Sequence, residues 1–282
     1  MIEFIVGIGV NYSQVLTGGV VVLHKLAFDL AKRGHKVYIF TEPAYPHPNI
    51  IVSEHSFENI SNIDFDPNNT VIIPPFDWKN NTNLKHVIRW ALYHISDELM
   101  QNVDKDDEIF NFGTFDIPTD KKVHTLTTFD YQKQTFYNRG LKRDKKYCHI
   151  LLKKNPPHHH EIISYFNSFN LDDYKSRGCF EYLAEKFNEY EYFITFDDKT
   201  FLTTAAAMCG CKSIILKNNS VNPFDYRNKN KIQGMGVSYG IDDLDWAERT
   251  IGLMPEYVDF LINSDDKTID EFINFWTKKL SI

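Results

Sequence analysis

Polar side chains follow a short apolar run in the second half of the chain. Residues 192–196 are apolar or aromatic apart from one threonine, and the next four, 197–200, read Asp-Asp-Lys-Thr. Small residues at helical spacing follow, from Phe201 to Met208. Amides at the start of a helix favour a phosphate group, and a carboxylate accepts hydrogen bonds from sugar or ribose hydroxyls. The pattern favours a sugar and phosphate site at Asp197 and Thr200, although Thr200 would also serve as a helix cap.

Two glycines in the first half form a second candidate site. Gly18 and Gly19 lie between a loop and an expected helix, beyond the carboxyl end of the expected first strand. Ligands bind at that edge of parallel sheets, and glycine lets a ligand approach the backbone. A plain turn is the other interpretation. Gly7 and Gly9 do not complete a dinucleotide-binding fingerprint, because Tyr12 stands where the third glycine belongs.

Histidines and cysteines occur in groups that do not favour a metal site. The run His-His-His-Glu at 158–161 is consecutive, so its side chains diverge on a helix. The four cysteines form no CxxC pair, and Cys209 and Cys211 are too close for the usual zinc spacing. We expect buried, reduced cysteines and no bound metal. His24, in the middle of an expected helix, is interpreted as a packing residue.

The hydrophobic pattern alternates strands and helices, as is typical of parallel α/β sheets. In the first half we expect strands at 2–8, 36–41, 70–73 and 108–112, with helices at 20–33 and 84–95. In the second half we expect strands at 147–152, 192–196 and 213–216, with helices at 178–187, 201–208 and 269–280. The helix at 84–95 would carry Arg89 as a surface cation beside Trp90.

This alternation predicts an α/β fold with two domains. The expected domains are residues 1–120 and 147–266, with a linker region at 121–146. The last segment, 267–282, carries an aromatic helical face that needs a groove, and the first domain is the candidate to supply one.

The segment 192–216 resembles the donor-binding core of GT-B glycosyltransferases. In the large retaining family of this type, two glutamates separated by seven residues flank the start of a helix. Asp197 falls on the first glutamate and Ala205 on the second, and Thr203 or Thr204 stands close enough to substitute. Three further stretches, 17–38, 71–92 and 236–247, are loosely similar to other parts of such enzymes, including poorly characterised members.

The resemblance implies two Rossmann-like domains that face an interdomain cleft. The second would bind a nucleoside-diphosphate sugar through Lys153, Lys154, Asp197, Thr200 and Thr204. The Gly18-Gly19 loop would face the reacting centre on the acceptor side. A lysine on the diphosphate neutralises the leaving group without a metal, so neither a metal nor another cofactor is expected. The acceptor would be a hydroxyl group of a glycan or another molecule.

Charge and hydropathy exclude several other classes of protein. The 282 residues carry a net charge of −7, and scattered basic residues do not favour nucleic-acid binding. No run approaches the roughly twenty apolar residues of a membrane span, and the N-terminus lacks the basic region of a signal peptide. We therefore expect a cytoplasmic protein, for which peripheral membrane contact stays open.

Two rival functions remain open at this point. One is a nucleotide-sugar-binding module without catalysis, which Ala205 favours. The other is a Rossmann oxidoreductase or epimerase, which the incomplete glycine fingerprint disfavours. The sequence assigns no general base and does not separate retention from inversion.

Overall fold

The chain divides into two compact units. The computed structural model describes residues 1–11, 18–113, 115–151, 156–177, 179–198, 200–216, 223–224, 227 and 234–281. The first unit combines Met1–Asp130 with Ile262–Ile282, and the second is Tyr131–Leu261. Each contains one parallel sheet with helices, so the expected α/β class with two parallel sheets is confirmed.

The first unit is built on a seven-stranded sheet in the order β3-β2-β1-β4-β5-β6-β7. Its strands are β1 Glu3–Val6, β2 Lys36–Ile39, β3 Ile50–Val52, β4 Thr70–Ile73, β5 His86–Ala91, β6 Glu108–Asn111 and β7 Val123–Thr125. All neighbouring strands are parallel. Six of them follow the doubly wound order in which the chain reverses direction between its first and fourth strands. The segment 121–146, expected to be a linker, contributes β7 to this sheet.

The expected helix at 84–95 is wrong, because residues 86–91 form the strand β5, which lies between β4 and β6. Five of its six residues are buried, so both of its faces are covered. A fully buried strand is a continuous apolar run, and such a run also matches helical spacing. Arg89 is consequently not a surface cation. Its side chain is fully buried and its Nε donates to Asp107 Oδ2 at 2.7 Å.

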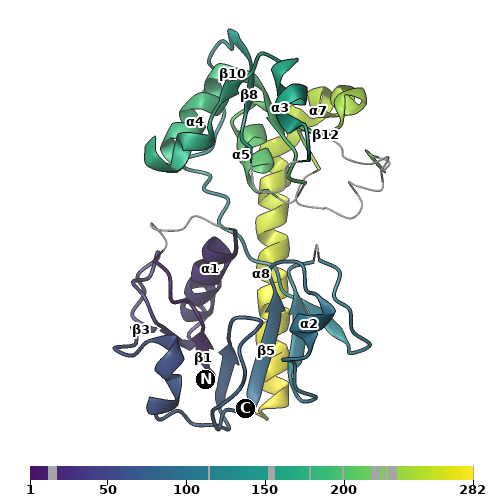
Figure 1. Ribbon diagram of the computed structural model, residues 1–282. Helices are drawn as coiled ribbons and strands as arrows, with labels where there is room; N and C mark the ends of the chain where they lie inside the picture. The colour runs from purple at the N-terminus through teal and green to yellow at the C-terminus, as the bar shows by residue number, and fades with distance from the viewer. Residues whose placement is uncertain are drawn as a thin grey trace. The chain divides into compact units, whose positions relative to one another are not determined.

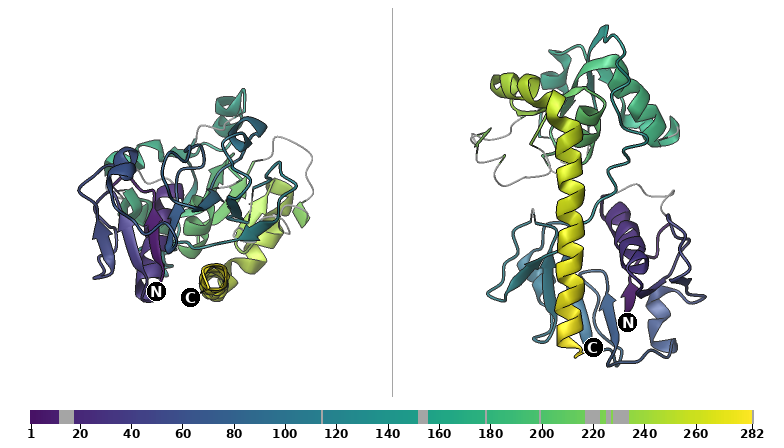
Figure 2. Two further views of the ribbon diagram at one scale, coloured as in Figure 1. Left: turned by 90° about the horizontal axis from the view of Figure 1, so that it is seen from below. Right: turned by 180° about the vertical axis from the view of Figure 1, so that it is seen from behind.

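One face of this sheet, here called the helix-covered face, packs against α1 (Gly18–Lys32) and the end of α8 (Met254–Lys279) (Figures 1 and 2). Phe4 and Ile88 meet Phe272 and Trp276 in one buried cluster. The expected final helix, 269–280, is therefore only the end of a much longer one. Pro255 lies in the first turn of α8. Backbone N–H groups there have no acceptor within the helix, so the N–H that proline lacks removes no helical hydrogen bond.

The opposite side, here called the loop-covered face, has no long helix among its described residues. It is covered by the 3₁₀ helix η1 (Phe57–Asn62), residues 74–85 and the short helix α2 (Asp97–Met100). The Arg89 guanidinium joins residues 74–85 to the loop before β6, because Nη1 donates to the carbonyl oxygens of Phe76 and Trp78 while Nε binds Asp107. Arg89 Nη2 is buried without a partner among the described residues.

The second unit contains a five-stranded parallel sheet in the order β12-β11-β10-β8-β9. Its strands are β8 Lys145–His149, β9 Phe169–Asn170, β10 Tyr190–Thr195, β11 Lys212–Ile215 and β12 Val237–Tyr239. Its helices are α3 His159–Ser164, η2 Asp172–Arg177, α4 Cys179–Glu189, α5 Leu202–Met208, η4 Ile241–Asp243, α7 Leu244–Thr250 and η5 Ile251–Leu253. Counted along the chain, this is the doubly wound order 2-1-3-4-5.

No helix in the described ranges has the length and the apolar character that crossing a membrane would demand.

Candidate functional site

The carboxyl edge of the second sheet contains a topological switch point between β8 and β10. These strands are neighbours, with Ile194 opposite His149, yet β9 intervenes between them in the chain. From β8 the chain continues to β9 on one side, whereas from β10 it continues to β11 on the other side. Open α/β sheets bind ligands in the crevice at such a point.

Asp197 and Thr200 lie in the loop that leaves β10 at this edge. Both residues are partly exposed. The backbone N–H of Asp197 donates to the buried Thr195 hydroxyl at 3.1 Å, which fixes the start of the loop. The Thr200 hydroxyl accepts from Leu202 N–H at 3.2 Å, just where α5 begins. The N-cap residue of α5 is Phe201, which makes no side-chain capping bond, so the Thr200 bond lies in the turn one residue before the cap.

The helix α5 packs on the sheet, and the threonine hydroxyl groups that it carries are buried. All its residues are buried, and Thr203 and Thr204 are fully so. Thr203 Oγ1 donates to the carbonyl oxygen of Thr200 at 2.9 Å. The predicted donor residue Thr204 is therefore covered by protein in this structure. Ala205, at the position of the second family glutamate, is also fully buried.

The predicted phosphate-binding lysines, Lys153 and Lys154, lie outside the described residues, as does Lys199. In the chain, two residues, 150 and 151, separate the end of β8 from this segment.

His149 is a further polar group at the switch point that the sequence analysis did not single out. It is the last residue of β8 and is buried, with Nδ1 2.7 Å from Ser168 Oγ. Burial lowers the pKa of His149. The Asp172 carboxylate opposes this by raising the pKa, while His160 lowers it further. The imidazole is therefore neutral at pH 7. Its signal in the sequence is a polar residue directly after the two apolar residues Tyr147 and Cys148 of a predicted strand.

Asp198 extends the same edge towards β12. Tyr239, the last residue of β12, is buried, and its pKa is raised by burial and by the nearby Asp198 carboxylate. Two strand ends that are not neighbours, those of β10 and β12, thus contribute polar groups to one edge of the sheet.

In the first unit, Gly18 and Gly19 form the beginning of α1. Among the described residues, a Cβ atom added at Gly18 would meet no atom within 4 Å, and one at Gly19 would only touch Leu92 Cδ1 at 4.0 Å. Neither glycine has a positive φ. Local packing therefore does not require glycine at either position.

His24, which was expected to be a packing residue, is buried in α1. Nε2 lies 3.1 Å from the Val10 carbonyl oxygen, and Nδ1 accepts from Ala44 N–H at 3.3 Å. Burial lowers its pKa, so the ring is neutral with its proton on Nε2. His24 ties the loops after β1 and β2 to the helix.

The described part of the chain contains no group of three metal-binding side chains. In the histidine run, His159 Nδ1 lies 2.8 Å from the Pro156 carbonyl oxygen and His158 Nδ1 lies 3.4 Å from Glu161. All four cysteines are free thiols, and all except Cys179 are buried.

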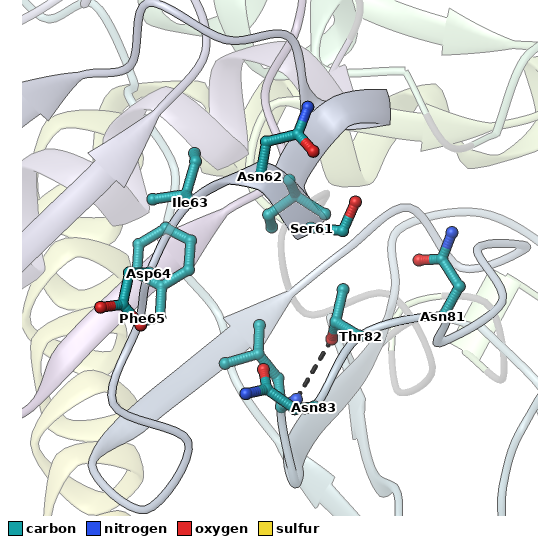
Figure 3. A pocket seen from close by; sticks show the side chains of 10 residues that line it. Ser61, Asn62, Ile63, Asp64, Phe65, Asn81, Thr82 and Asn83 are labelled. Carbon is teal, nitrogen blue, oxygen red and sulfur yellow. Dashed lines mark hydrogen bonds between the residues drawn. The ribbon is translucent and has the colours of Figure 1, made fainter.

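A cavity of about 380 Å³ opens on the loop-covered face of the first unit (Figure 3). It is lined by residues 60–65 and 81–84, and none of the predicted site residues contributes to it. Neither segment was predicted to hold a site residue.

A scan against protein-family models and a search of the curated proteins both found no match.

Proposed function

We propose that this chain is a glycosyltransferase that moves a sugar from a nucleoside diphosphate to a hydroxyl acceptor. The observation that carries the proposal is the switch point between β8 and β10, where the loop containing Asp197 and Thr200 leaves the sheet. A doubly wound sheet binds nucleotides at this place. The resemblance of segment 192–216 to GT-B donor domains points to the same residues.

In this proposal, the Asp197 carboxylate accepts hydrogen bonds from ribose or sugar hydroxyls. Lys153 and Lys154 neutralise the diphosphate as the sugar bond breaks. Thr200 orders the loop through its bond to Leu202 N–H. We leave Thr204 out of the contacts because its side chain is fully buried.

The acceptor side of the proposal rests on Gly18 and Gly19. The described residues leave room for a Cβ atom at both positions, so their packing does not account for glycine there. Close approach of a substrate to the backbone is another reason for glycine. A dinucleotide oxidoreductase fits this unit less well. Its fingerprint needs a third glycine after Gly7 and Gly9, and Tyr12 stands at that position.

A binding module without catalysis is the second candidate, and Ala205 is the observation that favours it. Its fully buried methyl group replaces a family glutamate, so no carboxylate is present at that position. Measured sugar transfer would exclude this candidate. Binding of a nucleotide sugar with neither transfer nor hydrolysis, across a broad acceptor panel, would establish it.

The proposal predicts that Asp197→Ala weakens binding of the nucleotide sugar more than it weakens folding. A panel of UDP, GDP, CDP and NAD in thermal-shift assays first identifies the nucleotide. Calorimetric titration of the corresponding nucleotide sugar should then show a loss of about 1.5–3 kcal/mol in Asp197→Ala, the value of a charge-assisted hydrogen bond. Thr200→Val should lose about 1 kcal/mol of folding free energy, because it lacks the hydroxyl that accepts from Leu202 N–H.

Glu181→Ala is the matched control, since Glu181 is an exposed carboxylate on α4 in the same unit. It should bind like the wild type. Wild-type affinity in Asp197→Ala, or stabilisation of the protein by NAD alone, would contradict the proposal. Transfer should also persist in EDTA and fall sharply in Lys153→Ala/Lys154→Ala. Loss of transfer in EDTA that Mg²⁺ restores would contradict neutralisation by lysines.

A further inference from the structure

The cavity on the loop-covered face has two preformed walls (Figure 3). One wall is the segment 81–84, which Asn80 holds through Oδ1, accepting from the Thr82 hydroxyl at 2.8 Å, and Nδ2, donating to the Leu84 carbonyl oxygen at 2.8 Å. Leu84 N–H in turn donates to Thr82 Oγ1 at 3.2 Å. These bonds lie within the loop itself, so no ligand is needed to shape this wall.

The other wall is the segment 60–65, at the end of η1. Ile63 N–H donates to the Ile60 carbonyl oxygen at 3.1 Å, which closes the last turn. The ring of Phe65 packs edge-on against Tyr38 of β2, with centroids 5.0 Å apart. The wall is therefore anchored on the sheet. At about 380 Å³, the space between the walls is within the range of small-molecule sites.

The base and the rim of the cavity differ in chemistry. Ile60, Phe65 and Leu84 are buried and supply an apolar base. The rim carries exposed polar side chains that make no hydrogen bond within the described chain, namely Ser61, Asn62, Asp64, Asn81 and Asn83. Each amide offers both donors and acceptors.

The charge of the lining restricts the ligand. Its ten residues include a single charged group, Asp64, and no lysine, arginine or histidine. An anion would meet a carboxylate with no cation to offset it, and one carboxylate is too few for a metal site. Hydroxyl groups, which both donate and accept, match the amides, while the C–H faces of a sugar ring match the apolar base.

We propose that this cavity is a binding site for an uncharged sugar, either free or at the end of a glycan. It lies in the first unit and shares no residue with the proposed nucleotide-sugar site, so it does not depend on that proposal. Sugar binding at Asn62 and Asn83 is the property to be tested.

Saturation-transfer NMR with glucose, galactose, mannose, N-acetylglucosamine and maltose tests the proposal on the full chain. At least one of these sugars should receive saturation from the wild-type protein. The double variant Asn62→Ala/Asn83→Ala should weaken its binding about tenfold or more, because two neutral hydrogen bonds are lost. Both side chains are exposed and make no hydrogen bond within the described chain, so folding should be unchanged.

Asn68→Ala is the matched control, because Asn68 is exposed in the same unit but does not line the cavity. It should bind sugar like the wild type, and so should Asp197→Ala, which separates this site from the proposed nucleotide-sugar site. Glucuronate should bind more weakly than glucose. Absence of binding by all five sugars, equal binding in the double variant, or tighter binding of glucuronate would each overturn the proposal.

Discussion

The two faces of the first sheet are closed in different ways. The helix-covered face joins α1 and α8 to the strands through one continuous apolar cluster. The loop-covered face has smaller apolar clusters, a fully buried arginine and an open cavity. Long helices satisfy their own backbone groups and close a sheet mainly with apolar contacts, whereas loops expose backbone carbonyl groups that need donors. On the loop-covered face, Arg89 supplies such donors to the carbonyl oxygens of Phe76 and Trp78.

Arg89→Met gives the largest expected effect. It should reduce the free energy of unfolding by about 3–5 kcal/mol, because Asp107 would remain buried without its partner. Urea melts measure this. The comparison is with Arg33→Met, which removes ion pairs to Asp266 and Asp270. Those carboxylates are 53% and 61% exposed, so the loss there should be about 1 kcal/mol or less.

The double variant Arg89→Met/Asp107→Asn should regain part of the lost stability, because it removes the unpaired charge. If Arg89→Met were no more destabilising than Arg33→Met, the contrast between the two faces would be wrong.

Gly7 and Gly19 allow the loop-covered and helix-covered faces of the first sheet to be compared by substitution. A Cβ atom at Gly7 would lie 2.9 Å from Pro75 Cδ and 3.1 Å from the Ile73 carbonyl oxygen. Residues 74–85, which cover the loop-covered face, begin at this place. Gly7→Ala should therefore lose about 1–3 kcal/mol. Gly19→Ala, in α1, should instead gain up to about 0.5–1 kcal/mol, because alanine favours helix and has room. Thermal melts of the two variants should shift in opposite directions, and shifts of the same sign would contradict this account.

The smallest expected effect is a pH dependence of the helix-covered face. Burial lowers the pKa of His24 below its ordinary value of 6.5. The unfolded chain therefore binds the proton more readily, so His24 contributes stability above pH 6.5 that is lost as the pH falls towards the lowered pKa. Each unit of that shift is worth about 1.4 kcal/mol.

Urea melts between pH 7.5 and pH 5 should show a shallower decline for His24→Gln, whose side chain keeps a donor and an acceptor but does not titrate. His55→Gln, at an exposed position, serves as the control and should decline like the wild type. Identical profiles for all three proteins would show that His24 does not contribute to the acid sensitivity.

The sequence predicted strands and helices that a polar segment separates from their neighbours. The prediction failed where burial on both faces removes the usual hydrophobic pattern. The segment 190–208 was recognised because a polar loop separates its strand from its helix. β5 was mistaken for a helix because burial on both faces removes the alternation that marks a strand. Arg89 was misplaced with it, since only the pairing partner Asp107 makes a buried guanidinium tolerable.

The candidate sites show the same limit. The position of Asp197 after a strand is visible in the sequence, but the pairing of its strand β10 with β8, which ends at His149, depends on sheet order. The full burial of Thr204 follows from the packing of α5 on the sheet, which a helical pattern with small residues does not specify. The cavity needs two segments that are distant along the chain to meet, and neither segment has a motif.

The division of α8 between the two units has a consequence for biosynthesis. Residues 131–261 form the second unit, and the first unit is completed only by residues that follow them. A ribosome delivers the chain from its N-terminus, and domains generally fold in the order in which they emerge. Phe272 and Trp276, which fill the core of the first unit, emerge after the whole second unit. On the nascent chain, the unit that begins first is therefore the last one that can finish folding.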